Sequence, residues 1–438
     1  MWNIKAVCLP LHIMNAYSNA TTTVKLTKKN SGKHMVPLIH AITGDISFTL
    51  ASTLEPIKED WLQAEPQDNL FLQYRYLRIL EMHPPLGMRF RFIVFYKKNI
   101  PAGVALCQLI NFKADQSLQG DETEEKNPCF FNTFARYLKG WVASKVEFDS
   151  LVCGNLLLTG EHGYYMNGEL IPIPQQTQAL NEALNQLILE EEKHKTRLSV
   201  ILLKDYEASN TDIRSSFSTL EYNEFTVQPS MILDIPPHWK SMDDYADDLH
   251  SKYRVRWRRA LKKGKDIVKK ELNATEVEAY LPKIHELYLQ IATNAGFNLV
   301  SLNEAYLLGM KESLENEFRV FGYFLKGELI AFYTTVDNGK ELEAHFLGFE
   351  QSLNHDLQIY LNILYDILEV GIISGVEKII YARTAMEIKS SVGAVAHEMY
   401  CYLRHRNSFS NRFMKPLLLY LRPDAPWEPR HPFKHQEL

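Results

Sequence analysis

The chain has 438 residues, enough for two or three domains, and its 46% hydrophobic and 23% charged residues are typical of a globular protein. The net charge of −5 argues against binding to nucleic acid through bulk charge, and no run approaches the roughly 18 uncharged apolar residues that would span a bilayer. The five cysteines are scattered without a C-x-x-C pair, which argues against a disulfide framework and a structural zinc site. We therefore predict no metal site and a cytoplasmic location.

The first 34 residues differ in composition from the rest of the chain. Lysines occur there, but no Asp or Glu precedes Asp45. The apolar run over residues 6–14 is short and is interrupted by Pro10 and His12, which disfavours a secretion signal. We predict a weakly ordered extension over residues 1–34. A targeting segment and an over-long start ahead of Met35 are the alternatives.

The first half is predicted to form one domain over residues 35–240. Runs rich in apolar residues and bounded by turn residues predict strands, and amphipathic runs predict helices. Helices are expected over residues 71–80, 130–141 and 175–194, strands over residues 90–96, 103–112, 150–158, 198–203 and 226–233, and an exposed loop over residues 113–127. Gly160 and Gly163 follow one of these strands and would permit close approach of the backbone to a ligand, although a plain turn is the simpler interpretation.

The second half is predicted to form a domain over residues 241–425, followed by a tail over residues 426–438. It begins with a helical segment, residues 245–270, in which eight of the fourteen residues 252–265 are basic and none is acidic. On a helix, Arg256 and Arg259 would share a face with Lys252 and Lys263. This face is either simply solvated or binds an anionic partner, such as a membrane surface, a nucleotide carrier, an acyl carrier protein or tRNA.

Residues 318–392 carry the clearest strand pattern in the chain. Helices are expected before it, over residues 277–294 and 303–316, and strands within it, over residues 318–325, 328–336 and 341–349. Asp337-Asn338-Gly339 predicts a tight turn between the last two strands. A helix over residues 353–374, with Asn354 as its N-cap and a polar stripe that we expect to face solvent, a strand over residues 378–382 and a short polar segment over residues 383–389 complete the series.

This order of elements resembles a GNAT-type acyltransferase core, and the whole chain resembles tandem GNAT-like proteins of the FemAB (peptidoglycan-bridge) and BioF2-like type. The segments that carry the resemblance are residues 69–77, 253–263, 345–349 and 382–389, and it extends over roughly residues 35–406. The resemblance implies an α+β fold of two tandem GNAT-like (acyl-CoA N-acyltransferase) domains, each a mixed, mostly antiparallel sheet flanked by helices. It also implies transfer of an acyl or aminoacyl group to an amine.

One segment departs from the GNAT pattern. Members that use acetyl-CoA have a glycine-rich loop after the fourth strand, whose N–H groups hold the pyrophosphate. Here residues 350–356 contain no glycine and two carboxylates, which would repel a pyrophosphate. We expect no tightly bound cofactor, with acyl-CoA or an acyl carrier protein as co-substrate. The candidate cofactor-binding residues then lie in the first half: Gly160, His162 and Gly163.

The candidate catalytic residues are His345, Asp356 and Tyr360. On the strand over residues 341–349, His345 shares a face with Glu341 and Glu343, so this face is either exposed or lines a site. A base with a pKa near neutral would suit deprotonation of an attacking amine. Asp356 begins a helix, where it is either a stabilising first-turn acid or an anchor for the amine.

Six residues are candidates for substrate binding: Tyr333, Arg383, Glu387, Lys389, Arg256 and Arg259. Arg383 or Lys389 would bind a carboxylate or phosphate of a substrate. The alternative is an ion pair between Arg383 and Glu387, which are four residues apart on the predicted short helix.

The leading hypothesis is an N-acyltransferase that moves an acyl group from a thioester to a small-molecule or lipid amine, in the cytoplasm or at the inner membrane face. One alternative is an aminoacyl-tRNA-dependent transferase of the peptidoglycan-bridge type, favoured by the basic segment and the missing pyrophosphate loop. The other is a non-catalytic GNAT-like binding protein. Activity abolished by ribonuclease would favour the first alternative, and no acyl transfer at all would favour the second.

Overall fold

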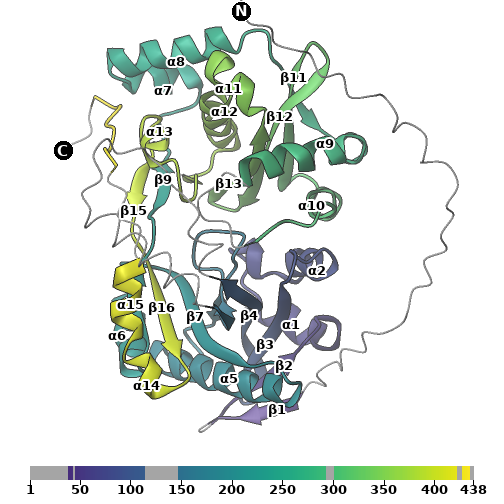
Figure 1. The fold of residues 1–438 in the computed structure, drawn as a ribbon, viewed down its shortest axis with the longest axis vertical. Helices are drawn as coiled ribbons and strands as arrows, with labels where there is room; N and C mark the ends of the chain where they lie inside the picture. The colour runs from purple at the N-terminus through teal and green to yellow at the C-terminus, as the bar shows by residue number, and fades with distance from the viewer. Residues whose placement is uncertain (1–37, 43–44, 114–146, 293–299, 422–426, 435–438) are drawn as a thin grey trace, which may run out of the picture. The chain divides into compact units, whose positions relative to one another are not determined.

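The structure, a computed structural model, describes residues 38–42, 45–113, 147–292, 300–421 and 427–434 (Figure 1). The predicted extension over residues 1–34, nearly all of the predicted loop over residues 113–127 and the predicted helix over residues 130–141 lie outside these ranges. Within the described residues the fold contains two mixed, mostly antiparallel sheets flanked by helices, which confirms the predicted fold class.

The first sheet has nine strands within the described part of the chain, in the order β1-β2-β3-β4-β5-β7-β16-β8, with β6 paired to β4. They are β1 (Leu38–Ala41), β2 (Ile46–Ala51), β3 (Arg89–Lys97), β4 (Ile100–Lys113), β5 (Glu147–Cys153), β6 (Tyr164–Met166), β7 (Leu198–Glu207), β8 (Asn223–Thr226) and β16 (Met399–His405). The strands β2 to β5 pair antiparallel, and β7 then pairs parallel to β5.

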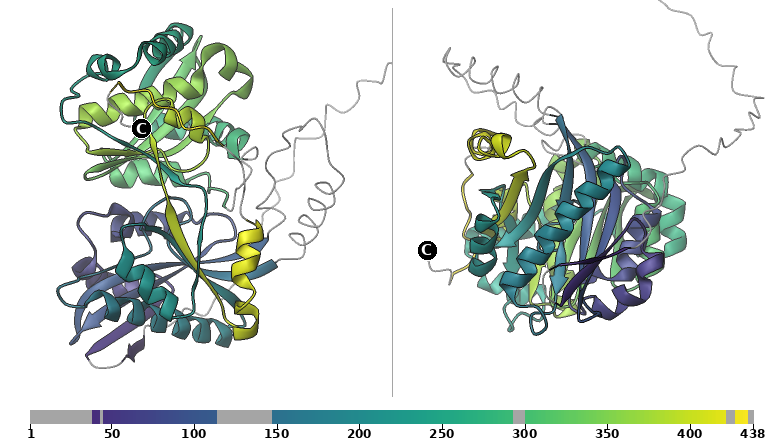
Figure 2. Two further views of the ribbon diagram at one scale, coloured as in Figure 1. Left: turned by 90° about the vertical axis from the view of Figure 1, so that its left-hand side faces the viewer. Right: turned by 90° about the horizontal axis from the view of Figure 1, so that it is seen from below.

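Helices pack on both faces of the first sheet. Trp61 of α1 (Lys58–Ala64) and Leu77 of α2 (Tyr74–Met82) belong to the same core as Phe92 of β3. On the other face, the buried side of α5 (Ile173–Lys193) shares a core with Ile201 of β7, and Figure 2 shows α5 lying along the sheet. The short helices η1 (Glu55–Ile57) and η2 (Leu70–Leu72) precede α1 and α2, and α6 (Thr211–Thr219) follows β7.

The second sheet has seven strands among the described residues, in the order β10-β11-β12-β13-β14-β9-β15. They are β9 (Ser230–Asp234), β10 (Val268–Leu272), β11 (Phe318–Leu325), β12 (Glu328–Asn338), β13 (Glu341–Phe349), β14 (Lys378–Ile380) and β15 (Val395–His397). The strands β10 to β13 pair antiparallel, and β14 pairs parallel to β13. The series from β2 in the first sheet and the series from β10 in the second therefore match strand for strand, which supports an internal duplication.

The second sheet also has helices on both faces. They are α7 (Met242–Asp248), α8 (Ser251–Lys263), α9 (Ala274–Ala292), α10 (Tyr306–Leu314), α11 (Gln351–Leu357), α12 (Ile359–Ser374) and α13 (Met386–Ser390). Residues of α9 and α10 pack into the same core as α1 and α2, so one apolar core joins the inner faces of the two sheets. The outer core contains most of α12. The C-terminal helices α14 (Ser408–Asn411) and α15 (Met414–Leu421) come after β16.

Each half of the chain contributes one strand to the sheet of the other. Strand β9, which precedes residue 240, pairs with β14 and β15 in the second sheet. Strand β16, near the end of the chain, pairs with β7 and β8 in the first sheet, where Figure 1 shows it in yellow beside the teal strands. A first domain cut at residue 240 would therefore contain a strand whose partners lie in the second half.

Three local predictions need correction. The predicted helix over residues 353–374 breaks at Gln358, which has φ 53° and ψ 42°, into α11 and α12. The expected solvent-facing stripe is partly internal, because Asn362 and Asp366 are buried. Residues 268–270, the end of the segment predicted as helical, belong instead to the edge strand β10.

No single helix in the described ranges is long and apolar enough to cross a membrane. By length and composition alone, the bent pair α11 and α12, with 73° between the helices, reaches that threshold. Most of α12 is buried in the protein core, which explains its apolar composition.

Candidate functional site

Two acidic side chains and a histidine line one face of β13. Glu341, Glu343 and His345 lie opposite Leu342 and Ala344, as predicted. The predicted alternation fails at Phe346, because a register shift in the pairing with β12 places Phe346 on the same side as His345, against Tyr306. Glu343 is only 3% exposed and has no hydrogen-bond or ion-pair partner among the residues that the structure describes. Burial, and then the nearby charge of Glu341, raise the pKa of Glu343 well above its ordinary value. A carboxylate whose pKa is raised by burial is a stronger base than an exposed one.

His345 begins a chain of polar contacts that crosses from the second sheet to the first half. Its Nε2 lies 3.1 Å from the Tyr306 hydroxyl and its Nδ1 lies 3.3 Å from the Thr334 hydroxyl. The Tyr306 hydroxyl lies 3.4 Å from that of Tyr76, which accepts a hydrogen bond of 2.9 Å from the Asn155 side chain. Desolvation lowers the pKa of His345 to about 3, so this imidazole is neutral at physiological pH. It can relay or accept a hydrogen bond but carries no charge there.

The loop after β5 fixes the far end of this chain of contacts. The Asn155 carboxamide oxygen accepts the backbone N–H of Leu157 at 3.0 Å, and the Gln108 side chain accepts the N–H of Leu156 at 2.9 Å. Asn155 and Gln108 are fully buried. Sequence patterns did not identify Tyr76, Asn155 or Tyr306 as site residues. Their only signal was a polar group within an apolar segment, which is not distinctive.

A buried ion cluster joins the ends of two equivalent strands. Asp205 lies near the end of β7, at the register shift in its pairing with β16, and Arg383 follows β14. Their side chains form a bidentate pair, with Nη1 to Oδ2 at 3.2 Å. Lys204 Nζ lies 2.5 Å from Asp205 Oδ2, and Arg383 Nε donates to the Gln228 carbonyl at 2.8 Å. Burial raises the pKa of Asp205, but the charges of Lys204 and Arg383 lower it more, so the net pKa is below its ordinary value. Arg383 therefore binds a carboxylate, but one that belongs to this chain.

The backbone after β14 adopts an uncommon conformation that Lys389 supports. Ala382, Thr384 and Ala385 have φ values of 58°, 66° and 46°, which side chains other than Gly rarely adopt. Lys389 is 4% exposed, and its ammonium donates to the carbonyls of Ala382 at 3.3 Å and Arg383 at 2.5 Å. Burial lowers the pKa of Lys389 to about 7. The backbone over residues 382–385 is therefore strained, is held by Lys389, and lies beside the ion cluster.

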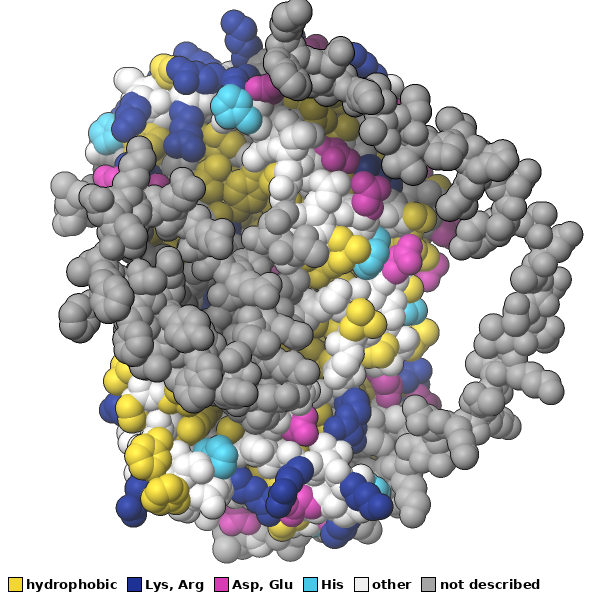
Figure 3. Space-filling view, viewed as in Figure 1, with side chains coloured by type: hydrophobic (Ala, Val, Ile, Leu, Met, Phe, Trp, Pro, Cys, Tyr) yellow, Lys and Arg dark blue, Asp and Glu magenta, His cyan; other side chains and the backbone are white. Residues whose placement is uncertain are grey.

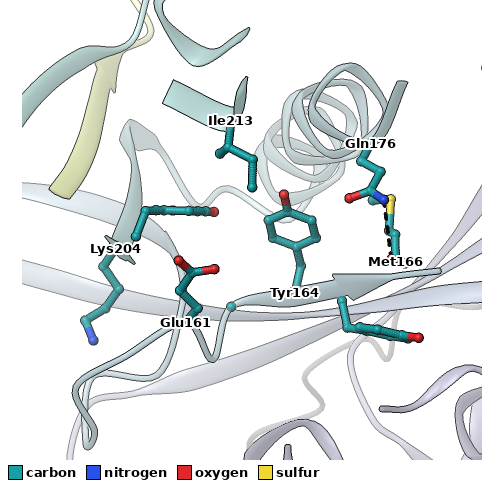
Figure 4. A pocket seen from close by; sticks show the side chains of 9 residues that line it. Glu161, Tyr164, Met166, Gln176, Lys204 and Ile213 are labelled. Atoms are coloured by element: carbon teal, nitrogen blue, oxygen red, sulfur yellow. Dashed lines mark hydrogen bonds between the residues drawn. The ribbon is translucent and has the colours of Figure 1, made fainter. Parts of the chain in front are cut away.

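A pocket of about 150 Å³ lies in the first half, next to the predicted cofactor-binding loop (Figure 4). It is lined by Glu161, Gly163, Tyr164, Tyr165, Met166, Gln176, Lys204, Tyr206 and Ile213. Of the three predicted cofactor-binding residues, Gly163 lines the pocket, whereas Gly160 and His162 are not among the lining residues. His162 Nδ1 lies 3.1 Å from the Asn69 carboxamide oxygen, and burial lowers the pKa of His162 to about 4.

Three other predicted residues lie away from the chain of polar contacts. Asp356 is exposed on α11, where it pairs only with the adjacent His355 at 3.0 Å among the described residues. Tyr360 is partly buried on α12 and faces the Phe349 ring, with centroids 6.0 Å apart. Tyr333 is buried and stacks on Phe321 at 4.7 Å.

The remaining predicted residues divide between α8 and α13. The predicted ion pair between Arg383 and Glu387 is not formed, because Asp205 holds Arg383 and Glu387 pairs with Arg430 at 3.3 Å. Arg256 is partly buried and Arg259 is exposed on α8. Within the described ranges, no group of three or more His, Cys, Asp or Glu side chains is placed to hold a metal ion.

The strand order decides the fold. In each half, four antiparallel strands are followed by a helix and a parallel strand. The chain has a tandem GNAT-like fold. No family model matches the sequence, and no curated protein matches it.

Solved structures with a similar arrangement include three proteins of low sequence identity. FemX is 12% identical with a TM-score of 0.49, over 82% of this chain and 98% of that one. The C-terminal domain of a putative lysylphosphatidylglycerol synthetase from Agrobacterium fabrum is 9% identical with a TM-score of 0.44, over 84% and 96%. A tandem GNAT protein from the clavulanic acid biosynthesis pathway is 9% identical with a TM-score of 0.46, over 83% and 99%.

Proposed function

We propose that this protein is an N-acyltransferase, which moves an acyl group from a thioester donor to an amine. The observation that carries the proposal is the Glu343 carboxyl group, which is buried, has no partner in the described part of the chain and lies beside His345 on the central strand β13. Retaining such a carboxyl group costs stability, because its ionised form is poorly solvated there. A functional role accounts for this cost.

The chemistry assigned to Glu343 is that of a general base. An acceptor amine arrives as its ammonium ion, and Glu343 removes one proton to free the nitrogen lone pair. The nitrogen then attacks the thioester carbonyl, so that a C–N bond forms and the C–S bond breaks. The departing thiolate takes up the second proton that the nitrogen loses as the amide forms. A positioned base of this kind contributes about 10²- to 10⁴-fold to the rate. The neutral His345 lies two residues further along β13 and is linked through Tyr306 to Tyr76. Burial and, as a smaller cause, the charge of Glu343 raise the pKa of Tyr76 to about 12.

The donor is expected to bind weakly rather than as a resident cofactor. In the second half, the segment that would hold a pyrophosphate is the glycine-free helix α11, preceded by Glu350, whose carboxylate pairs with Lys283 at 2.6 Å. Acyl-CoA and an acylated carrier protein therefore both remain in the proposal as co-substrates. Of the glycines in the first half, Gly163 lines a pocket, which supports a ligand there without identifying a donor.

The basic helix α8 supports a further part of the proposal, an anionic partner. Its cations Arg256, Arg258, Arg259 and Lys262 have no ion-pair partner in the part of the chain that the structure describes. Figure 3 shows Lys and Arg side chains gathered where α8 lies. Val255 of the same helix is exposed. Cations around an exposed apolar side chain suit peripheral contact with an anionic membrane or an acyl carrier protein. Such cations also bind the phosphate backbone of nucleic acids, so aminoacyl-tRNA is the second candidate donor.

The test is an acyl-transfer assay with the full chain. The purified protein is incubated with a panel of acyl-CoAs, acylated carrier protein or aminoacyl-tRNA, together with mixed amines, and both thiol release and the mass of the amide product are measured. We expect Glu343→Gln to lower kcat about 100-fold. Glu328→Gln, at an exposed glutamate of the neighbouring strand β12, should leave it unchanged. Transfer by the Glu343→Gln variant at the wild-type rate, or no transfer from any donor, would refute the proposal.

A further inference from the structure

The pocket in the first half lies between β6, β7, α5 and α6 and has room for a small ligand. Its volume of about 150 Å³ is similar to that of cavities that accept a benzene-sized molecule, or about six heavy atoms. Figure 4 shows Glu161 and Tyr164 side by side, with Gln176 and Met166 on one side and Lys204 on the other. The hydrogen-bonding capacity of these side chains decides which ligand fits.

The nitrogen donors of the pocket are already used. Lys204 has three N–H groups, and they are directed to the carbonyls of Asn155 at 2.9 Å and Leu158 at 2.8 Å and to Asp205 at 2.5 Å. Gln176 has two amide N–H groups, and they are directed to the carbonyls of Met166 at 3.3 Å and Ile171 at 2.7 Å. Neither side chain has a donor left for a ligand.

The acceptors, in contrast, are in excess. Among the described residues, only one carboxylate oxygen of Glu161 is engaged, by the backbone N–H of Glu207 at 2.8 Å and by the side chain of Asn210. Within the same ranges Glu161 has no ion-pair partner. The Tyr164 hydroxyl is buried and has no hydrogen-bond partner there either. Figure 4 shows the Gln176 amide oxygen on the side of Tyr164, away from Met166.

The free acceptors of the pocket point to a cation. Lys204 and Arg383 balance the charges of Asp205 and Glu161, but the Lys204 ammonium is held by Asp205 and two backbone carbonyls, so among the described residues the free oxygen of Glu161 is the charged group available to a ligand. A phosphate or carboxylate ligand would meet this carboxylate and would find no nitrogen donor. The rings of Tyr164 and Tyr206, with centroids 6.4 Å apart, add aromatic surface that attracts a cation.

We infer that this pocket binds the ammonium group of a small primary amine, held by Glu161 and the Tyr164 hydroxyl. The identity of the ligand rests on the proposed function, in which the acceptor is an amine. The acceptor would then carry an amino group that stays charged at Glu161 and another that loses its proton at Glu343. Glu207 lies between the pocket and the β13 face. Its backbone N–H donates to Glu161. Burial and, as a smaller cause, the charge of Glu207 raise the pKa of Glu341 on that face.

The direct test measures binding by ligand-observed NMR, with three probes of similar shape: n-butylammonium, n-butanol and butyrate. We expect n-butylammonium to bind the full-length wild-type protein and the other two to bind at least tenfold more weakly. Glu161→Gln should weaken n-butylammonium binding about 10- to 100-fold, because a charged hydrogen bond is lost. The amide oxygen introduced by this substitution can still accept the two existing hydrogen bonds, so the thermal midpoint of the variant should match that of the wild type.

A second variant keeps the test informative if Glu161→Gln fails to fold. Tyr164→Phe removes a hydroxyl that has no partner in the described chain, so it should not destabilise the fold but should weaken n-butylammonium binding. Equal binding of n-butanol, preferential binding of butyrate, or unchanged n-butylammonium affinity in the folded variants would overturn the inference. The assay needs no turnover, so loss of n-butylammonium binding and loss of acyl transfer in Glu343→Gln are separate results. Loss of n-butylammonium binding tests the pocket, and loss of acyl transfer tests the proposed function.

Discussion

Replacing Arg383 by Met should destabilise the fold through the buried cluster between the equivalent strands β7 and β14. The Asp205 side chain is 0% exposed and that of Arg383 is 20% exposed, so the pair is largely removed from water. Loss of one partner of a buried ion pair costs about 3–5 kcal/mol, because the remaining charge is left uncompensated. Lys204 still pairs with Asp205 in this variant, so we expect a value near the lower end, about 3 kcal/mol.

The measurement is equilibrium urea unfolding at pH 7, followed by circular dichroism, with Arg406→Met as the matched control. Arg406 also forms a bidentate pair, with Glu192, but the two side chains are 41% and 35% exposed. The control should lose less than about 1 kcal/mol, because solvent screens exposed pairs. Similar losses in the two variants would refute the conclusion that the Arg383 pair is a buried tie between the halves.

Three further predictions concern Glu343, His345 and Asn362. The pKa of Glu343 is raised in the folded state, so the unfolded state releases this proton first as pH rises above the unfolded value of about 4.3, and the free energy of unfolding falls. Glu343→Gln should therefore raise the thermal midpoint at pH 7 but not at pH 4. His345, with a pKa of about 3, should show no protonation by NMR between pH 5 and pH 8, and a transition there would contradict its desolvation. Asn362→Ala should cost about 2 kcal/mol in urea unfolding, because Nδ2 donates to the carbonyls of Ala260 at 3.0 Å and Leu357 at 3.1 Å, and a loss below about 0.5 kcal/mol would show that these bonds contribute little.

The strands of the second half could be predicted because local signals were strong there. Alternation along residues 341–349 correctly placed Glu341, Glu343 and His345 on one face. The hairpin after β12 was also predicted, but its chemistry differs in part. Gly339 has the positive φ of 74°, whereas the Asn338 side chain accepts the N–H of Leu70 at 2.8 Å and so contributes to contact with the first half.

Other elements could not be predicted because distant contacts decide them. Strand β10 contains Lys269, Lys270 and Glu271, a charged run that forms a strand only because β11 pairs with its backbone. The break at Gln358 has no Gly or Pro to mark it. The predicted N-cap role of Asn354 is wrong, because Asn354 lies within α11 and Gln358 is the N-cap of α12. The Asn354 side chain instead accepts the N–H of Tyr360, in the first turn of α12, at 3.0 Å.

Only part of the candidate site could be predicted from the sequence, because contacts between distant segments form the rest. His345 and its acidic neighbours share one strand, so a period of two was sufficient to group them. Tyr76, Asn155 and Tyr306 are separated from them by long stretches of chain. The packing of α2 against α10 brings Tyr76 close to Tyr306, and the loop after β5 brings Asn155 to Tyr76. Arg383 was predicted to bind a carboxylate or phosphate of a substrate, whereas in the structure it pairs with Asp205, which is 178 residues away in the sequence.

The position of β16 constrains how this chain can fold during synthesis. The first sheet has β16 between β7 and β8, yet residues 399–405 are made after nearly all of the second half. During synthesis, the edge of β7 that pairs with β16 therefore stays unpaired while about 190 further residues are added, at about 5–20 residues per second. An open strand edge is a template for wrong pairing, so this interval of at least about ten seconds is when the nascent chain is most exposed to aggregation or chaperone binding.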